Sequence, residues 1–289
     1  MNALELRDLT RRYPDFTLDR LNLTLPSGCI LGLIGENGAG KSTTIRLILD
    51  MIRRDAGSVT VFGKEVREAG ASLREDLGVV LDEVGVPGCL NAGQVGKVMA
   101  GVFRRWDAGV YADYLKRLDI PENRRFEEFS RGMKMKLGIA VALSHSPKLL
   151  ILDEATSGLD PLVRDEVTDL FSDFTRDEGR AVLISSHIVT DLEKICDYVA
   201  FLHKGRLLLC EEKDRLKERY GVLRCSAERL AELEPAAVLG KREGPYGTEA
   251  IVERDAVPSG TELGAMDIEQ LFIFMAKSDL PPVKEEKES

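Results

Sequence analysis

The loop from Gly35 to Thr43 constrains the fold more than any other part of this sequence. It reads Gly-Glu-Asn-Gly-Ala-Gly-Lys-Ser-Thr, which contains the pattern G-x-x-x-x-G-K-[ST]. The apolar run Cys29 to Ile34 before it has the length of a buried strand, and apolar residues recur at helical spacing after it, as far as Met51. Strand, glycine loop and helix is the order that a phosphate-binding loop requires, so the sequence predicts a nucleoside triphosphate site here.

Each residue type in this loop suits the chemistry of a phosphate group. The glycines permit close backbone approach, and successive N–H groups can then surround phosphate oxygens at the positive end of the following helix. Lys41 adds a point charge, and the Ser42 hydroxyl suits Mg²⁺. The predicted ATP-binding residues of the loop and helix start are Gly35, Glu36, Asn37, Gly38, Ala39, Gly40, Lys41, Ser42, Thr43 and Thr44.

Two adjacent carboxylates follow a second apolar strand, Leu149 to Leu152. Ligands of open α/β sheets bind at the carboxyl ends of the strands, which is where Asp153 and Glu154 would lie. Asp153 is predicted to hold Mg²⁺, and Glu154 to polarise the attacking water. An Asp-Glu pair usually only marks the end of a strand, but downstream of a phosphate loop the catalytic interpretation is favoured.

Bulk composition excludes several classes of protein. Forty Lys and Arg against 49 Asp and Glu give a net charge of -9, which disfavours a phosphate backbone as partner, so no nucleic acid is expected. The five cysteines are scattered without a C-x-x-C pair, which argues against zinc and disulfides. The sequence shows neither a signal peptide nor an apolar stretch of ~18 residues, so we expect a soluble chain and a membrane span, if any, from another chain.

The remaining patterns indicate how the chain is divided. Strands alternating with helices predict a mostly parallel sheet that is buried on both faces. We expect an ATPase domain over residues 1–210, with a helical subdomain at about 86–146. Beyond it, 211–280 predicts a small α+β domain, with helices over Glu211–Tyr220, Ala227–Leu233 and Ile268–Met275 and a strand over Val222–Cys225. Residues 281–289 are predicted to be a disordered, solvated tail.

Three further runs occur in register with these motifs. Phe129-Ser130-Arg131-Gly132-Met133 precedes the carboxylate strand, Ser157-Gly158-Leu159-Asp160 follows it, and Ser185-Ser186-His187 ends the next strand. In this order they resemble the nucleotide-binding domain of ABC transporters, over roughly residues 3 to 210. The resemblance implies an α/β P-loop NTPase cassette: a RecA-like core, an antiparallel β subdomain, a helical subdomain and here a small C-terminal α+β appendage.

The resemblance also implies roles for single residues. Tyr13 would stack on adenine, the alternative being a plain aromatic residue at a strand end. His187 would touch the γ-phosphate and orient Glu154, joining Lys41 and Glu154 as a catalytic residue, although a lone histidine after a strand is usually structural. Asp160 would contact the opposing subunit.

The signature segment is Ser130, Arg131, Gly132 and Met133. The resemblance implies that Ser130 and Gly132 bind the γ-phosphate of a nucleotide held by a partner subunit. Ser130 is equally readable as a helix N-cap, and it can be both.

Three positions depart from the family pattern. Arg131 stands where no side chain is usual, and it could pair with a phosphate or point to solvent. Asp82 replaces a glutamine that contacts Mg²⁺, and an aspartate can still ligate the ion. Ala155 stands where proline often follows the Asp-Glu pair. None of these changes removes a phosphate ligand or the base, so ATP hydrolysis is expected.

Together with Trp106-Asp107, these departures are similar to a bacterial branch of export-type cassettes whose permease is a separate chain. This implies two ATPase subunits, identical or related, around two Mg²⁺-ATP, driving a permease for drugs, peptides or similar cargo at the cytoplasmic face of the bacterial plasma membrane. The alternative is a soluble ABC-type ATPase for translation or DNA maintenance, which normally carries two cassettes or a long coiled coil. The 211–280 region is interpreted as a dimerisation or regulatory element, or as structural padding.

Overall fold

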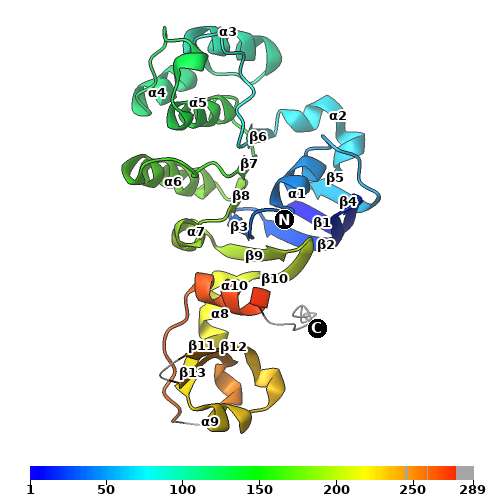
Figure 1. Ribbon diagram of the computed structural model, residues 1–289. Coiled ribbons are helices and arrows are strands. Elements are labelled where there is room, and N and C mark those ends of the chain that lie inside the picture. The colour runs from blue at the N-terminus through cyan, green and yellow to red at the C-terminus, as the bar shows by residue number, and fades with distance from the viewer. Residues whose placement is uncertain (245–246, 259, 278–289) are drawn as a thin grey trace.

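The computed structural model describes residues 1–244, 247–258 and 260–277. A central sheet carries a helical subdomain at one end, a second sheet beside it and a small C-terminal region at the other end (Figure 1). No helix within these described ranges is both long and apolar enough to cross a bilayer. The predicted tail, 281–289, lies outside the described residues.

The central sheet has six strands in the order β10-β9-β3-β8-β7-β6. All its pairings are parallel except that of β9 with β10. Its strands are β3 (Ile30–Ile34), β6 (Leu77–Val80), β7 (Leu149–Asp153), β8 (Ala181–Ser186), β9 (Tyr198–His203) and β10 (Arg206–Glu212). The predicted parallel sheet is therefore confirmed, and the carboxyl ends of β3, β7 and β8 lie at one edge.

Strand β7 shows why this sheet is covered on both faces. Successive side chains of a strand point to opposite faces, so Leu149 and Ile151 join one apolar cluster while Leu150 and Leu152 join another. Helix α1 (Lys41–Ile48) belongs to the first cluster, and helix α6 (Pro161–Thr175) belongs to the second. Every residue of β7 is buried.

An antiparallel sheet of four strands stands beside the central one, in the order β2-β1-β4-β5. Its strands are β1 (Asn2–Arg12), β2 (Thr17–Pro26), β4 (Ala56–Val61) and β5 (Lys64–Glu65), with helix α2 (Val66–Arg74) following. Buried and exposed positions alternate from Leu21 to Leu25 of β2, so one face of this strand is apolar and buried. This is the antiparallel β subdomain.

Three helices form the helical subdomain, α3 (Ala92–Val102), α4 (Ala108–Arg117) and α5 (Arg131–Leu143). Each begins at a side chain that accepts a backbone N–H: Asn91 in a reciprocal capping box, Asp107, and Ser130. The interpretation of Ser130 as a helix N-cap is therefore confirmed.

The C-terminal region combines a three-stranded antiparallel sheet, in the order β11-β13-β12, with short helices. Its elements are α8 (Lys213–Arg219), β11 (Tyr220–Cys225), α9 (Ala227–Ala231), β12 (Val238–Gly244), β13 (Gly247–Glu253) and α10 (Ile268–Lys277). Three predicted helix boundaries are wrong: Glu211 belongs to strand β10, Tyr220 belongs to strand β11, and α9 stops two residues before Leu233. At Glu211 and Tyr220, pairing with the neighbouring strands overrides the helical charge pattern.

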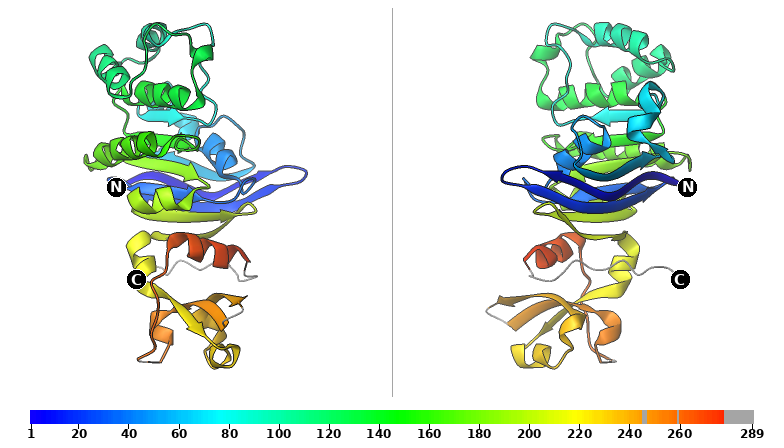
Figure 2. Two further views of the ribbon diagram at one scale, coloured as in Figure 1. Left: turned by 60° about the vertical axis from the view of Figure 1, so that its left-hand side comes forward. Right: turned by 90° about the vertical axis from the view of Figure 1, so that its right-hand side faces the viewer.

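Helix α10 joins this region to the central sheet. It lies between the small sheet and the β9–β10 edge in all three views (Figures 1 and 2). Phe272 meets Phe201 of β9 edge-on, with ring centroids 5.4 Å apart. Ile268 and Leu271 are fully buried within the same apolar cluster as the central sheet.

Candidate functional site

The phosphate loop adopts a path that only glycine permits at two positions. A Cβ atom on Gly35 would stand 2.4 Å from the carbonyl oxygen of Leu202, and Gly40 has a φ of 112°. Gly40 is also the N-cap of α1, where no side chain caps the helix. The first N–H groups of α1 therefore remain available to an anion.

Lys41, the first residue of α1, is the buried charge of the site. Its ammonium donates to the carbonyl oxygen of Gly35 at 2.7 Å and lies 3.3 Å from Oε1 of Glu154. Its side chain is only 6% exposed. A buried ammonium is tolerated only when it is paired and hydrogen-bonded, and both conditions are met here.

Glu154 is the other centre of the site, and its backbone is held in an unusual conformation. It follows β7 with a φ of 53°, in the left-handed region that non-glycine residues rarely adopt. Its N–H donates to the carbonyl oxygen of Ser185 at 3.1 Å, which pins this turn against β8. A strained backbone persists only where the surrounding structure enforces it. Here the left-handed conformation directs the Glu154 carboxylate toward the phosphate loop.

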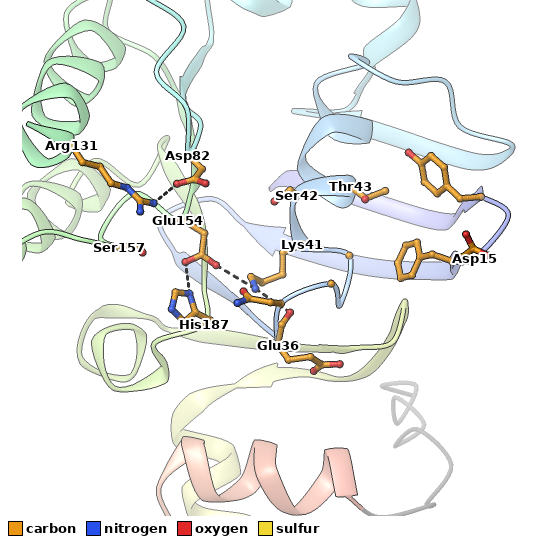
Figure 3. Close-up of a pocket in the computed structure, with 15 residues that line it drawn as sticks. Asp15, Glu36, Lys41, Ser42, Thr43, Asp82, Arg131, Glu154, Ser157 and His187 are labelled. Atoms are coloured by element: carbon orange, nitrogen blue, oxygen red, sulfur yellow. Dashed lines mark hydrogen bonds and ion pairs between the residues drawn. The ribbon is translucent and has the colours of Figure 1, made fainter. Parts of the chain in front are cut away.

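His187 completes this group from the end of β8. Its Nδ1 lies 2.8 Å from Oε2 of Glu154, so the carboxylate stands between His187 and Lys41 (Figure 3). The three predicted catalytic residues therefore meet, although they come from the ends of three different elements.

Asp153 and two other predicted Mg²⁺ ligands supply only oxygen atoms. Asp153 is 4% exposed and accepts a hydrogen bond from the Ser185 hydroxyl at 2.6 Å. Ser42 and Asp82 line the cavity described below. Among the described residues, no cluster of three or more His, Cys, Asp or Glu side chains forms a metal site. This donor set fits Mg²⁺ that is held largely by nucleotide phosphates and water.

A cavity of about 760 Å³ lies between the phosphate loop and the ends of β6, β7 and β8. It unites most of the predicted residues. Its lining consists of Tyr13, Asp15, Phe16, Glu36, Asn37, Gly38, Gly40, Lys41, Ser42, Thr43, Asp82, Arg131, Glu154, Ser157 and His187.

Other predicted residues lie outside this lining, among them Gly35, Ala39 and Asp153. Thr44 is fully buried and donates to the carbonyl oxygen of Gly40. Ser130 caps α5, and Asp160 caps α6. Gly132 and Met133 belong to the first turn of α5 and do not line the cavity either.

Four residues at or beside the cavity are not predicted from the sequence. Asp15 and Phe16 line it, but no spaced motif marks them. Ser157 also lines it, and although it begins the run Ser157-Gly158-Leu159-Asp160, the sequence assigns it no role. His203 lies 2.8 Å from the Glu36 carboxylate. Burial acts to raise the pKa of Glu36, yet the His203 contact and backbone N–H groups outweigh it and hold that pKa below its usual value.

Tyr13 follows β1, and its side chain is 38% exposed. The Arg11 guanidinium lies 4.9 Å from the ring centroid, and the Phe16 ring is a neighbour at 6.4 Å. Adenine stacking by Tyr13 stays a prediction.

The site combines a strand, a glycine loop and a helix with a buried lysine, and acidic residues lie beside it at the ends of parallel strands. This arrangement defines a P-loop nucleoside triphosphatase.

Comparison with known proteins shows which family of P-loop nucleoside triphosphatases this is. The family model described as ABC transporter matches residues 18–157. The bacitracin transport ATP-binding protein BcrA of Enterococcus faecalis is 34% identical over 213 residues, which cover 71% of this chain and 68% of BcrA.

A second sequence relative and a solved structure support the same family. The daunorubicin/doxorubicin resistance ATP-binding protein DrrA of Streptomyces peucetius is 29% identical over an alignment covering 97% of this chain and 91% of DrrA. A solved ATP-binding subunit of an ABC transporter superimposes with a TM-score of 0.68 at 26% identity, covering 74% of this chain and 92% of that one. The chain therefore belongs to the ATP-binding subunits of ABC transporters, and it is an ABC-type ATPase, as the sequence predicts.

Proposed function

We propose that this chain works as one of two ATPase subunits that close around two Mg²⁺-ATP and drive a separate integral membrane permease. One observation carries the proposal: the cavity holds the phosphate loop, Glu154 and His187, whereas Ser130 and Gly132 lie outside it. The site is thus one half of a composite, and signature residues of a second subunit would supply the other half. Identical or related subunits can both do this, because the chain carries both halves.

The roles of the residues follow from the charge that phosphoryl transfer must stabilise. Lys41 and the N-terminus of α1 hold the β- and γ-phosphates. Glu154 orients the attacking water and accepts its proton, and His187 keeps the carboxylate in place. Mg²⁺ bound with the nucleotide supplies positive charge, and Ser42, Asp82 and Asp153 would hold it.

An apolar groove supports docking of a permease helix. It lies between α3, α5 and the segment after α1, with a volume of about 1010 Å³. Met51 and Val102 line it and are 58% and 62% exposed, which is unusual for large apolar side chains unless a partner covers them. The structure describes no membrane-spanning helix in residues 1–244, 247–258 or 260–277, so this partner would provide the span.

The names of two relatives support a proposal about the transported cargo. BcrA is named for bacitracin transport and DrrA for daunorubicin/doxorubicin resistance. We therefore propose export of drugs, peptides or similar compounds, with the ATPase at the cytoplasmic face of the bacterial plasma membrane. A soluble ABC-type ATPase is disfavoured by the same names.

Replacing Glu154 by glutamine tests this function. Glu154→Gln keeps the shape of the side chain but removes the proton acceptor, so turnover should fall by about 10²–10⁴-fold while ATP still binds. With ATP the variant should accumulate as a dimer, measured by light scattering together with phosphate release. Glu178→Gln, at an exposed carboxylate away from the cavity, should hydrolyse ATP normally. Full turnover in Glu154→Gln, or a monomer at saturating ATP, would refute the proposed role.

A further inference from the structure

Arg131 and Asp82, two positions at which this chain departs from the family pattern, form an ion pair. The Arg131 guanidinium lies 2.5 Å from Oδ1 of Asp82 (Figure 3). Arg131 is the first residue of α5, and Asp82 stands two positions after β6. Both line the nucleotide cavity. The unusual residues therefore compensate each other's charge within one subunit.

The path of the arginine side chain adds a second contact. A Cβ atom on Gly158 would lie 3.4 Å from Cδ of Arg131 and 3.6 Å from its Nε, so the side chain passes over Gly158. A Cβ atom on Gly132 would likewise lie 3.4 Å from Cδ2 of Leu159. The start of α5 is thus in contact with the loops after both β6 and β7, and its one cationic side chain in the signature segment points toward its own subunit's cavity.

We infer that the Arg131–Asp82 pair is an intrasubunit latch that holds the signature segment toward its own cavity and has to open when two subunits close on ATP. This inference rests on the proposed ATP-driven dimer. In that dimer the signature segment faces the partner's nucleotide, and a guanidinium binds phosphate oxygens more strongly than it binds an exposed carboxylate. On closure, Arg131 therefore exchanges the Asp82 carboxylate for the phosphate of the partner subunit's nucleotide. Asp82 then becomes free to interact with the Mg²⁺-ATP of its own subunit.

The exposure of the pair limits the strength of this latch. The Arg131 and Asp82 side chains are 57% and 51% exposed. Ion pairs with such exposure shift an equilibrium by about two- to five-fold. Because closure of a homodimer opens two pairs, the combined effect on dimerisation is about 4- to 25-fold. The latch therefore tunes the ATP concentration at which the subunits close.

A double-mutant cycle in the Glu154→Gln background tests the latch, with the ATP concentration at half-dimerisation as readout. The proteins carry Asp82→Asn, Arg131→Gln, both or neither. Asp82→Asn also removes a proposed Mg²⁺ ligand in both backgrounds, so the readout is the difference between its effects with and without Arg131. Because each closed dimer opens two pairs and takes up two ATP, this difference should be about two- to five-fold in ATP concentration, in the direction of easier dimerisation when Arg131 is present. Glu83→Gln, the neighbouring exposed carboxylate, should have no effect. An equal shift in both backgrounds, or a less favourable shift when Arg131 is present, overturns the latch.

Hydrogen exchange of the nucleotide-free protein tests the same contact without dimerisation. The first backbone N–H groups of α5 should exchange faster in Asp82→Asn and in Arg131→Gln, and at the parental rate in Glu83→Gln. If the parent fails to dimerise with ATP, the proposed dimer fails, and unchanged exchange in the two variants refutes the latch separately.

Arg131 could instead bind the nucleotide of its own subunit, because it lines that cavity. The affinity of monomeric protein for a fluorescent ATP analogue distinguishes this. The latch predicts that Arg131→Gln binds the analogue as tightly as the parent. A loss of about fivefold or more in the monomer would make Arg131 a ligand in its own site and overturn the latch.

Discussion

At the scale of the residue, Lys41, Glu154 and His187 show what a motif can predict. They are far apart in the sequence, yet each one lies in a glycine loop or just after a strand that the sequence predicts. Because the carboxyl ends of parallel strands share one edge of the sheet, the sequence order alone brings their backbones together. Their contacts within 3.3 Å follow from this placement.

Other contacts at this scale are not predictable from spacing. The Arg131–Asp82 pair joins residues 49 positions apart, and its formation depends on the rotation of α5 against the loop after β6. His203 reaches Glu36 because β9 is the neighbour of β3, and nothing in the sequence indicates that pairing. Side-chain direction is a product of packing, which short motifs do not encode.

His145 carries a prediction about pH. Its Nε2 donates to the carbonyl oxygen of Leu77 at 3.0 Å, and its ring stacks on Phe103 with centroids 3.9 Å apart. Burial lowers the pKa of His145 below its ordinary 6.5. The unfolded chain therefore takes up the proton more readily, so this histidine's contribution to stability is complete above pH 6.5 and is lost as the pH falls from there toward the lower folded pKa.

Urea unfolding at pH 7.5 and 5.5 measures this effect. The parent should lose stability over this interval by at most about 1.4 kcal/mol per pH unit from this one group, and His145→Phe should lack that component. His187→Phe is the control, because His187 is 42% exposed. An identical pH dependence in the parent and His145→Phe would contradict the prediction.

At the scale of the element, periodicity predicts the helices and the buried strands well and their ends less well. Helix α5 starts where Ser130 caps it, as expected, and β7 extends one residue further to include Asp153. Strands β9 and β10 are not predicted from their sequences, because a short apolar run fits a strand and a buried helix equally. Glu211 and Tyr220 carry a helical pattern, but strand neighbours pair with them.

Two glycines on α3 carry a prediction at this scale. A Cβ atom on Gly96 would lie 2.6 Å from the Tyr111 ring, whose hydroxyl donates to the carbonyl oxygen of Ala92. Nothing lies within 4 Å of a Cβ on Gly101. Gly96→Ala should therefore destabilise the protein by about 1–3 kcal/mol, because the ring cannot move without losing that contact.

Gly101→Ala is the matched control on the same helix. It should stabilise the protein by up to about 1 kcal/mol through helix propensity. Urea unfolding measures both variants. If Gly96→Ala proves as stable as Gly101→Ala, then α3 and α4 are not packed as closely as Tyr111 indicates.

At the scale of the whole molecule, the groove beside α3 is the surface that would connect ATP to a membrane partner. Val102 lines it, whereas Val110 on α4 is 37% exposed and does not. Val102→Glu should reduce co-purification with the integral membrane protein encoded by a neighbouring gene by about tenfold, since a buried unpaired carboxylate is costly. ATP turnover of the isolated chain should be unchanged.

Val110→Glu adds the same charge outside the groove and should retain the membrane protein at the parental level. Equal retention by Val102→Glu and Val110→Glu would remove the groove from the proposed interface. Loss of turnover in Val102→Glu would indicate a folding defect instead, which is why both quantities are measured on one preparation.

The order of strands in the central sheet also determines when the ATP site can form during synthesis. Strand β3, which leads into the phosphate loop, pairs with β8 and β9, about 150 residues later in the chain. At about 5–20 residues per second, a ribosome takes roughly 8–30 s to add that length. During this interval the loop has no neighbouring strand to fix it, and ATP cannot stabilise the nascent chain. Binding of its own ligand can therefore stabilise the protein only after β8 and β9 have left the ribosome.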